Sequence, residues 1–191
     1  MSSLSPVATR QVILQQEGFY KGKIDGSSGP LTLQAELDFK TKWGSMAEIC
    51  PSPNYTASEN PCRGVVWHHS CGSWAGDKSW IQNPDSEVSY HAEISLKGEI
   101  VFYVPFKYRA WHAGKSIYRG LSGCNAFMIG IAFTGDTYER ELNDRELESA
   151  KKLFDRFDFS REWTTDHRTV SPGRKNDLSP KQFDRLMDTL F

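Results

Sequence analysis

The chain has 191 residues, of which 38% are hydrophobic and 25% are charged, and its formal net charge is −1. This is the length and composition of an ordinary globular protein with one domain, or with one domain and a small module. The balance of 23 basic against 24 acidic residues argues against the basic surface of a nucleic-acid binder. The sequence has no apolar stretch long enough to span a membrane, and residues 1–16 lack the pattern of a secretory signal peptide.

Residues 1–44 are predicted to form a small helical unit. The segment 7–16 is typical of a short helix, and Gly18 follows it where a C-terminal cap belongs. After a stretch rich in glycine and turn residues, a second helix with an apolar side is predicted to begin near Thr32. That side consists of Ala35, Phe39 and Trp43 in one row, with Leu33 and Leu37 beside it. Two short helices bury little apolar surface, so the unit is expected to lean on its neighbour.

Residues 45–63 carry three prolines and many small polar residues, which predicts a linker or a long irregular loop. Two of the four cysteines, Cys50 and Cys62, lie in this segment, and the others are Cys71 and Cys124. Their spacing matches no CxxC zinc pattern. Because no signal peptide is visible, we expect free thiols, and a Cys50–Cys62 bridge is the alternative to test first.

Residues 64–191 are predicted to form an α/β domain around one central sheet, because strands alternate with helices along this part of the chain. The helices are expected to begin at the N-caps Asn143, with Glu146 completing a capping box, and Ser179. The predicted elements are strands at 64–70, 127–135 and 163–170, a hairpin at 90–105 that turns at Lys97-Gly98, and helices at 143–157 and 179–191.

The histidines suggest a metal site. A catalytic zinc takes three protein ligands and leaves its fourth position to water. His68 and His69 are neighbours on a predicted strand, so their side chains point to opposite faces and only one of them can reach a given metal. Periodicity does not choose between them. The sequence lacks the HExxH signature of the commonest zinc proteases.

The segment 166–177, "DHRTVSPGRKND", combines a histidine, a lysine and two aspartates around a turn. Gly173 can take the positive φ that such a turn requires. An extended chain beyond it would direct Lys175 and Asp177 to the same side. A carboxylate can bind zinc, whereas a protonated lysine can stabilise negative charge that develops on a nearby oxygen. The alternative is a solvated polar loop.

Five segments, in this order, resemble the zinc-dependent N-acetylmuramoyl-L-alanine amidases of the type-2 family, over about residues 64–190. They are "VVWHHS", "VSYHAEISLKGEIVFYVPF", "RAWHAGKS", "CNAFMIGIAFTGD" and "DHRTVSPGRKND". That family includes anhydromuramoyl-peptide amidases of cell-wall recycling, phage endolysins and animal peptidoglycan-recognition proteins. The resemblance implies its fold, in which helices flank a mixed central β-sheet.

The resemblance also implies site residues. It assigns His68, His167 and Asp177 as ligands of a Zn²⁺ cofactor, and Lys175 as the residue that stabilises the oxyanion. The chain departs from the recycling amidases at Ala132, where they usually carry glutamate. They also tend to carry arginine just before the hairpin turn, where this chain has Ser95 and Leu96.

Phage members place a tyrosine before the hairpin, where this chain has Tyr90. It is inferred to be catalytic, orienting the zinc-bound water or hydrogen-bonding the scissile amide, and the alternative is a packed aromatic side chain. The candidate substrate-binding residues are Trp111, His112 and His69. Each has a structural alternative: Trp111 as a core side chain, and the two histidines as hydrogen-bonded structural residues.

Residues 5–44 resemble the small peptidoglycan-binding module of many cell-wall hydrolases, through "GFY", "IDG" and "GP", with Asp25 expected to tie the loop. Together the resemblances imply a zinc peptidoglycan hydrolase that cleaves the amide between N-acetylmuramic acid and L-alanine. The expected role is a modular phage endolysin held in the host cytoplasm until release. The alternatives are a cytoplasmic amidase that recycles anhydromuropeptides and a murein-recognition protein without catalysis. The expected partner is bacterial peptidoglycan rather than nucleic acid or membrane, and the expected state is a monomer.

Overall fold

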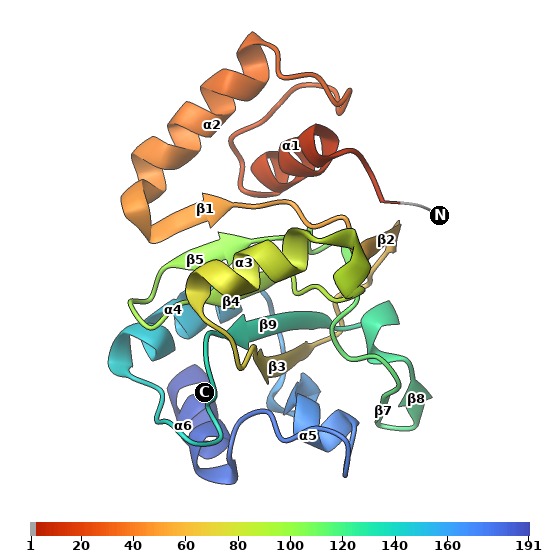
Figure 1. The fold of residues 1–191 in the computed structure, drawn as a ribbon, viewed down its shortest axis with the longest axis vertical. Coiled ribbons are helices and arrows are strands. Elements are labelled where there is room, and N and C mark those ends of the chain that lie inside the picture. The colour runs from red at the N-terminus through yellow and green to blue at the C-terminus, as the bar shows by residue number, and fades with distance from the viewer. Residues whose placement is uncertain (1–2) are drawn as a thin grey trace.

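A six-stranded mixed sheet forms the centre of the protein in the computed structural model, which describes residues 3–191 (Figure 1). β4, β9, β3 and β10 run parallel, β5 is antiparallel to β4, and β1 runs parallel to β5. In order across the sheet the strands are β1 (Ala47–Ile49), β5 (Ile100–Phe102), β4 (Ala92–Ile94), β9 (Ile129–Phe133), β3 (Val65–His69) and β10 (Thr164–Asp166). The predicted α/β class with a mixed central sheet is therefore confirmed.

Two small two-stranded sheets accompany the main one. β2 (Tyr55–Glu59) pairs with β6 (Tyr108–Ala110), and β7 (Ile117–Tyr118) pairs with β8 (Leu121–Ser122). Short 3-10 turns lie at Gly44–Met46, Pro84–Ser86, Cys124–Ala126 and Arg161–Trp163.

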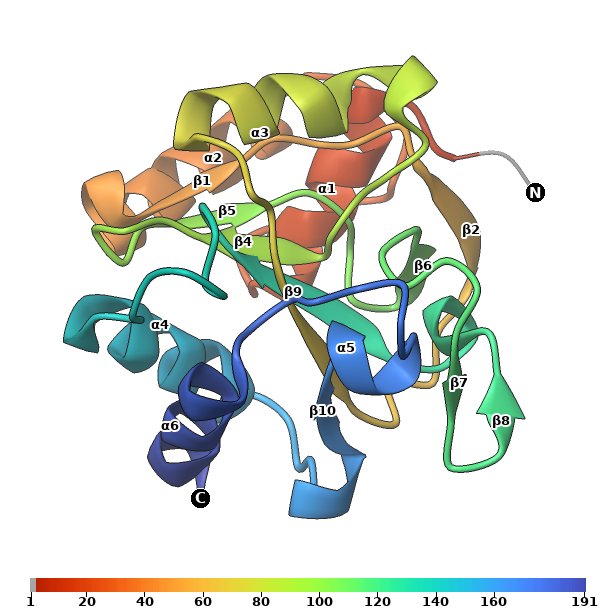
Figure 2. The same ribbon diagram turned by 60° about the horizontal axis from the view of Figure 1, so that its bottom comes forward.

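Helices cover both faces of the main sheet. α4 (Asp144–Phe154) and α6 (Pro180–Leu190) lie on one face and α3 (Trp74–Gln82) on the other (Figure 2). α3 was not expected from the sequence. The capping box of Asn143 and Glu146 is present at the start of α4, and the Ser179 side chain caps α6. Within the described chain, none of the helices combines the length and apolar character needed to cross a bilayer.

α1 (Pro6–Gln16) and α2 (Pro30–Trp43) form a pair that lies beyond the β1 edge of the sheet (Figure 1). Phe39 packs edge-on against Phe102 of β5, with ring centroids 6.3 Å apart. The buried Thr9 and Tyr55 hydroxyls lie 2.8 Å apart. The helical pair therefore shares a hydrophobic core with the sheet. Leu33 and Leu37 do not join that core, because they are 56% and 57% exposed.

The predicted linker at 45–63 is wrong for much of its length, because β1 joins the main sheet and β2 pairs with β6. Proline and small polar residues favour loops locally, but these strands are stabilised by partners 45 or more residues away in the chain. All four cysteines lie in the described part of the chain and are free. The Cys50–Cys62 bridge is not formed, and the Cys62 thiol instead donates to the Phe106 carbonyl at 3.1 Å.

Candidate metal centre

The parallel strands deliver the candidate ligands to one edge of the sheet. His68 is the fourth residue of β3 and pairs with Ala132 of β9. β10 pairs with the other side of β3, and α5 (His167–Val170) begins directly after it. Because β3, β9 and β10 are parallel, their carboxyl ends meet at one edge. α5 follows the carboxyl end of β10 and contacts β3, which brings His167 to His68 across 99 positions of sequence.

Three ligand atoms converge on one point. His68 Nδ1 lies 3.0 Å from His167 Nδ1 and 3.3 Å from Asp177 Oδ2, and His167 Nδ1 lies 3.0 Å from the same oxygen. All three side chains are buried. Tetrahedral zinc with Zn–N bonds of about 2.0–2.1 Å places neighbouring ligand atoms about 3.3 Å apart. The observed spacing therefore fits a small ion bound at the centre.

The contacts of the Nε2 atoms show which ring nitrogen of each histidine carries the proton. His167 Nε2 faces the Ala113 carbonyl at 3.3 Å, so it carries the proton and Nδ1 is left as a lone pair. His112 Nε2 faces the Met128 carbonyl at 3.2 Å, so His112 Nδ1 is an acceptor. It lies 3.0 Å from His68 Nε2, which must then carry the His68 proton. The three converging atoms are therefore all acceptors, and a cation satisfies them.

The charge state of the group also suits a metal. Burial is the main reason that the pKa of His68 is lowered to about 4, so its imidazole is neutral at pH 7. Burial alone would raise the pKa of Asp177, but donated protons and positive charge from the facing histidines, when these are protonated, hold that pKa below the ordinary 3.8, and a bound cation would act in the same direction. Two imidazole nitrogens and one carboxylate oxygen form a donor set that zinc accepts.

The loop that carries Asp177 is fixed by a residue that the sequence analysis did not single out. Gly173 has φ +75°, as predicted for the turn. Arg174 then donates to the Ala113 and Lys115 carbonyls at 2.8 and 3.1 Å, and so holds this loop against residues 113–115. Lys175 follows and is exposed. Its positive charge contributes to the lowered pKa of His68, after burial and His167.

Tyr90 lies beside the group, with its ring 5.2 Å from the His68 ring. Its hydroxyl donates to the His69 carbonyl at a long 3.4 Å. Burial raises the pKa of this hydroxyl well above 10, and Asp177 and Glu93 add to the effect, so the group stays protonated. The other predicted aromatic residue, Trp111, is half-buried and donates from Nε1 to Thr56 Oγ1 at 3.0 Å.

His112 and His69, the two histidines predicted to bind substrate, are both buried and in contact with other protein atoms. His112 is 4% exposed and stands behind His68, with both ring nitrogens in contact with protein atoms. Its ring lies over Gly130, where an added Cβ would come within 2.3 Å of its Cγ. His69 is 6% exposed and lies between Cys71 and Asp136. The only sequence signal for the role of Gly130 is a glycine inside a buried strand pattern.

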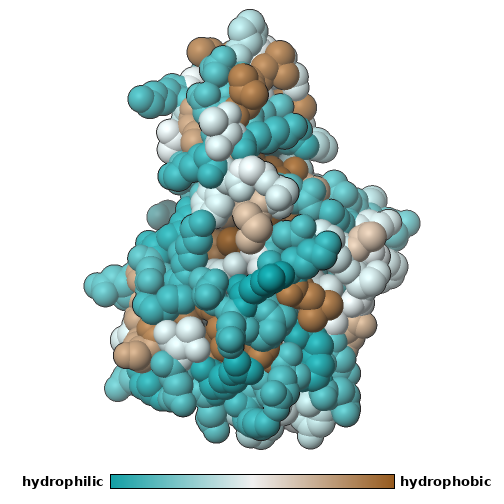
Figure 3. All heavy atoms as spheres, turned by 90° about the vertical axis from the view of Figure 1, so that its left-hand side faces the viewer, coloured by the Kyte–Doolittle hydropathy of each residue, from teal (hydrophilic) through white to brown (hydrophobic). Residues whose placement is uncertain are grey.

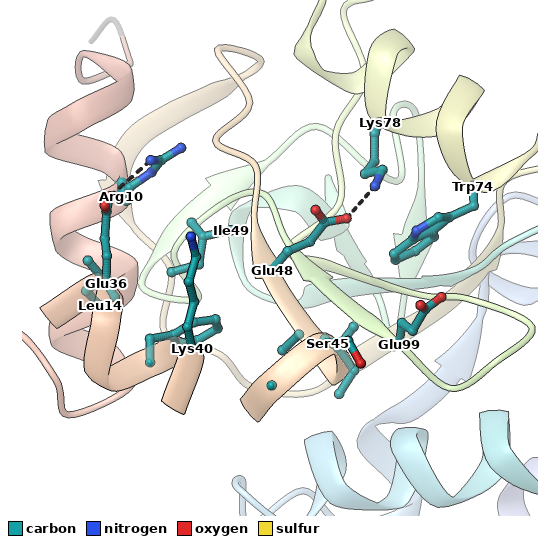
Figure 4. A pocket seen from close by; sticks show the side chains of 14 residues that line it. Arg10, Leu14, Glu36, Lys40, Ser45, Glu48, Ile49, Trp74, Lys78 and Glu99 are labelled. Carbon is teal, nitrogen blue, oxygen red and sulfur yellow. Dashed lines mark hydrogen bonds and ion pairs between the residues drawn. The ribbon is translucent and has the colours of Figure 1, made fainter. Parts of the chain in front are cut away.

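A groove of about 630 Å³ lies away from these ligands, between the α1–α2 pair and the β1 edge of the sheet. Figure 4 shows Arg10 paired with Glu36 on one side of β1, and Lys78 paired with Glu48 on the other. Trp74 at the start of α3 also lines it. Figure 3 shows this side of the molecule, where the surface narrows between the helical pair and the sheet and apolar atoms appear among polar ones.

Comparison with known proteins identifies the family. The family model described as N-acetylmuramoyl-L-alanine amidase (Amidase_2) matches residues 58–180. The 1,6-anhydro-N-acetylmuramyl-L-alanine amidase AmpD of Escherichia coli (strain K12) is 42% identical over 161 residues, which cover 72% of this chain and 88% of that protein. The Citrobacter freundii protein of the same name is 34% identical and covers 72% of this chain and 86% of its own.

Solved structures agree with this result. A selenomethionine derivative of AmpD is 31% identical, with a TM-score of 0.61, and the match covers 75% of this chain and 96% of that one. A mutant endolysin from Bacillus subtilis, 18% identical with a TM-score of 0.59, covers 76% of this chain and 98% of its own and shares the fold. The chain therefore belongs to the N-acetylmuramoyl-L-alanine amidase family and is an amidase that acts on peptidoglycan.

Proposed function

We propose that this amidase depends on zinc and that His68, His167 and Asp177 hold the ion. The observation that carries the proposal is the convergence of three buried acceptor atoms within 3.3 Å of one another. When bound, zinc would polarise the scissile carbonyl and lower the pKa of a water molecule to about 7. His112 would keep the His68 ring in position through its contact with Nε2.

Two neighbouring side chains would act on the substrate. Lys175 would stabilise the negative charge that develops on the carbonyl oxygen as the amide is attacked. Tyr90 would donate a hydrogen bond to the attacking water or to the amide, for which its hydroxyl must leave the long contact with His69. Ala132, which pairs with His68 across the sheet, has no carboxylate that could bind the attacking water or the amide. Glu93, the next residue across the sheet, has both oxygens bonded to the Tyr103 and Thr134 hydroxyls at 2.7 Å.

The first candidate substrate is a soluble 1,6-anhydromuramoyl peptide, cut between the muramic acid and L-alanine. This choice is supported by the relatives that are 34–42% identical to this chain and cover 72% of it, because they are 1,6-anhydro-N-acetylmuramyl-L-alanine amidases. It replaces the endolysin role that the sequence analysis placed first.

Polymeric peptidoglycan is the second candidate, and the groove of about 630 Å³ favours it. The groove is lined by both the α1–α2 pair and the sheet, so a polymer that also occupied this groove would contact the helical pair. This would give residues 5–44 the peptidoglycan-binding role that their resemblance implies. A tethered polymer would raise the local concentration of scissile bonds.

One experiment separates these functions. The purified protein is incubated with a defined anhydromuramoyl tetrapeptide and, separately, with sacculi, and the products are identified by mass spectrometry. Cleavage of the soluble peptide alone supports the first candidate, and release of stem peptides from sacculi supports the second. Activity in both assays should vanish with a chelator, return with added zinc, and be absent from Asp177→Ala. Binding to sacculi without cleavage of either substrate would contradict the proposed catalysis.

A further inference from the structure

A second group of ligand-type side chains lies beside the proposed catalytic centre. It consists of His69 at the end of β3, Cys71 in the loop that follows this strand, and Asp136 in the loop that follows β9. Three hydrogen bonds join these loops: Ser70 N–H to the Phe133 carbonyl at 3.0 Å, Cys71 N–H to the Gly135 carbonyl at 3.2 Å, and Gly135 N–H to Ser70 Oγ at 3.1 Å. The group is therefore held in place before any ligand binds.

The histidine stands between a sulfur and two carboxylates. Its Nε2 lies 3.1 Å from Cys71 Sγ and 3.9 Å from Asp177 Oδ1. Its Nδ1 lies 3.2 Å from Asp136 Oδ1. Cys71 has the left-handed φ of +59°, which is uncommon for a residue with a side chain. Asp177 has its other oxygen, Oδ2, in the proposed catalytic group, so the two groups share this aspartate.

We propose that His69 Nε2, Cys71 Sγ and Asp177 Oδ1 form a second binding site for a thiophilic divalent cation such as Zn²⁺ or Co²⁺. Zn–S bonds of about 2.3 Å with Zn–N and Zn–O bonds of about 2.0–2.2 Å separate the ligand atoms by roughly 3.3–3.6 Å. The two separations from His69 Nε2, 3.1 Å to Cys71 Sγ and 3.9 Å to Asp177 Oδ1, lie on either side of that range. Small rotations of the exposed Cys71 side chain can adjust them.

Asp136 has a separate task in this site. Binding at Nε2 requires the imidazole proton on Nδ1, directed at the Asp136 carboxylate, an arrangement that fixes the ring of many metal-bound histidines. The Thr137 N–H also points at Nδ1, at 3.2 Å, and must give up that acceptor when the metal binds. The Cys71 thiol releases its proton to solvent as the thiolate bonds to the cation.

The neighbouring charges both oppose and favour a second ion. Lys175 and an ion in the first group repel it, whereas the Cys71 thiolate, Asp136 and the shared Asp177 attract it. The second site is therefore expected to fill after the first. An ion there would use the free oxygen of Asp177 and stand beside the substrate carbonyl, so excess metal should lower the amidase rate.

Cobalt substitution tests the site, because only the second group contains sulfur. The metal-free protein is titrated with Co²⁺ while absorption is followed through the visible and near ultraviolet. The first equivalent should give ligand-field bands alone, and the second should add a near-ultraviolet sulfur-to-cobalt charge-transfer band. Cys71→Ser should lose that band and one of the two ions while keeping the first-equivalent spectrum. Saturation of the wild-type protein without this band would overturn the proposal.

A matched control guards against other thiols. Cys62 is also a free cysteine with a left-handed φ, +48°, and Cys62→Ser should keep the charge-transfer band unchanged. Persistence of the band in Cys71→Ser would place the sulfur elsewhere and refute the site. In His68→Ala the first group is broken, and the band should appear with the first equivalent of Co²⁺. Because these readouts are spectroscopic, a failure of the proposed zinc amidase activity would be seen separately, in the hydrolysis assay.

Discussion

Replacing Gly130 with alanine should weaken metal binding although Gly130 touches no metal. An alanine Cβ at this position would lie 2.3 Å from His112 Cγ and 2.6 Å from its Nδ1. Ordinary contacts begin near 3.4 Å, so the ring must move by about 1 Å to relieve the clash. His112 Nδ1 is the atom that holds His68 Nε2 at 3.0 Å, and moving it releases the His68 ring.

The expected loss of zinc affinity can be estimated from other groups that orient a metal ligand without binding the metal. Loss of a group that orients a metal ligand lowers affinity by about 10–100-fold, which is roughly 1.4–2.7 kcal/mol. The overpacked side chain also destabilises the fold by about 1–3 kcal/mol. Zinc affinity is measured by competition with a chromophoric chelator, and stability by urea unfolding of the metal-free protein. Gly29→Ala is the control for zinc affinity, because Gly29 has φ −81° and open space around its Cβ position. Gly29 is the N-cap of α2, so a small loss of stability with unchanged zinc affinity is expected there.

A double-mutant cycle shows whether the effect passes through His112. In a His112→Ala background the ring is absent, so Gly130→Ala should cause little further loss of affinity. Equal losses in both backgrounds would refute the reasoning, as would a folded Gly130→Ala protein that binds zinc like the wild type.

Three other substitutions test the site and the fold. Lys175→Ala should keep its zinc but lose activity by a barrier increase of roughly 2.7–4 kcal/mol, and near-native turnover would remove the proposed role of the lysine. Burial raises the pKa of Glu93 from its ordinary 4.5 to about 8. The stability that this carboxyl adds is present below pH 4.5 and is lost as the pH rises through about 8, by at most roughly 5 kcal/mol. Urea unfolding of Glu93→Gln should therefore show a flatter pH dependence than the wild type, and parallel curves would count against it. Asn143→Ala removes the N-cap of α4 and should lower the unfolding free energy by about 0.5–2 kcal/mol, measured by thermal or urea denaturation, whereas an unchanged value would show that the cap is not needed.

Local sequence patterns were sufficient to predict the hairpin and the two capped helices in the second half of the chain. The hairpin turn at Lys97-Gly98 joins β4 and β5 as predicted, and the caps of α4 and α6 lie where their residues indicate. These features depend on neighbours in sequence. The strand predicted at 163–170 is only partly right, because β10 ends at Asp166 and the chain turns into α5. There Asp166 caps the helix by accepting from Thr169 N–H.

Features that depend on distant partners escaped prediction. β1 contains one acidic and two apolar residues, which predict no particular element, and it is stabilised by pairing with β5. Periodicity alone left the choice between His68 and His69 open, because both lie on one strand, and only the family resemblance pointed to His68. In the structure His68 meets His112 and His167, which lie 44 and 99 positions further along the chain.

The proton positions in the site carry a wider consequence for folding. Carbonyls of Met128 and Ala113 hold protons on the outer nitrogens of His112 and His167, and so leave lone pairs on His68 Nδ1 and His167 Nδ1 facing Asp177. Lone pairs that face one another in a buried space are unfavourable. The proposed ion would relieve this repulsion only in the folded protein, because the unfolded chain does not bring the three ligands together. Metal binding would therefore be coupled to stability, and the backbone carbonyls that make the site fit for a metal would also make the fold depend on that metal.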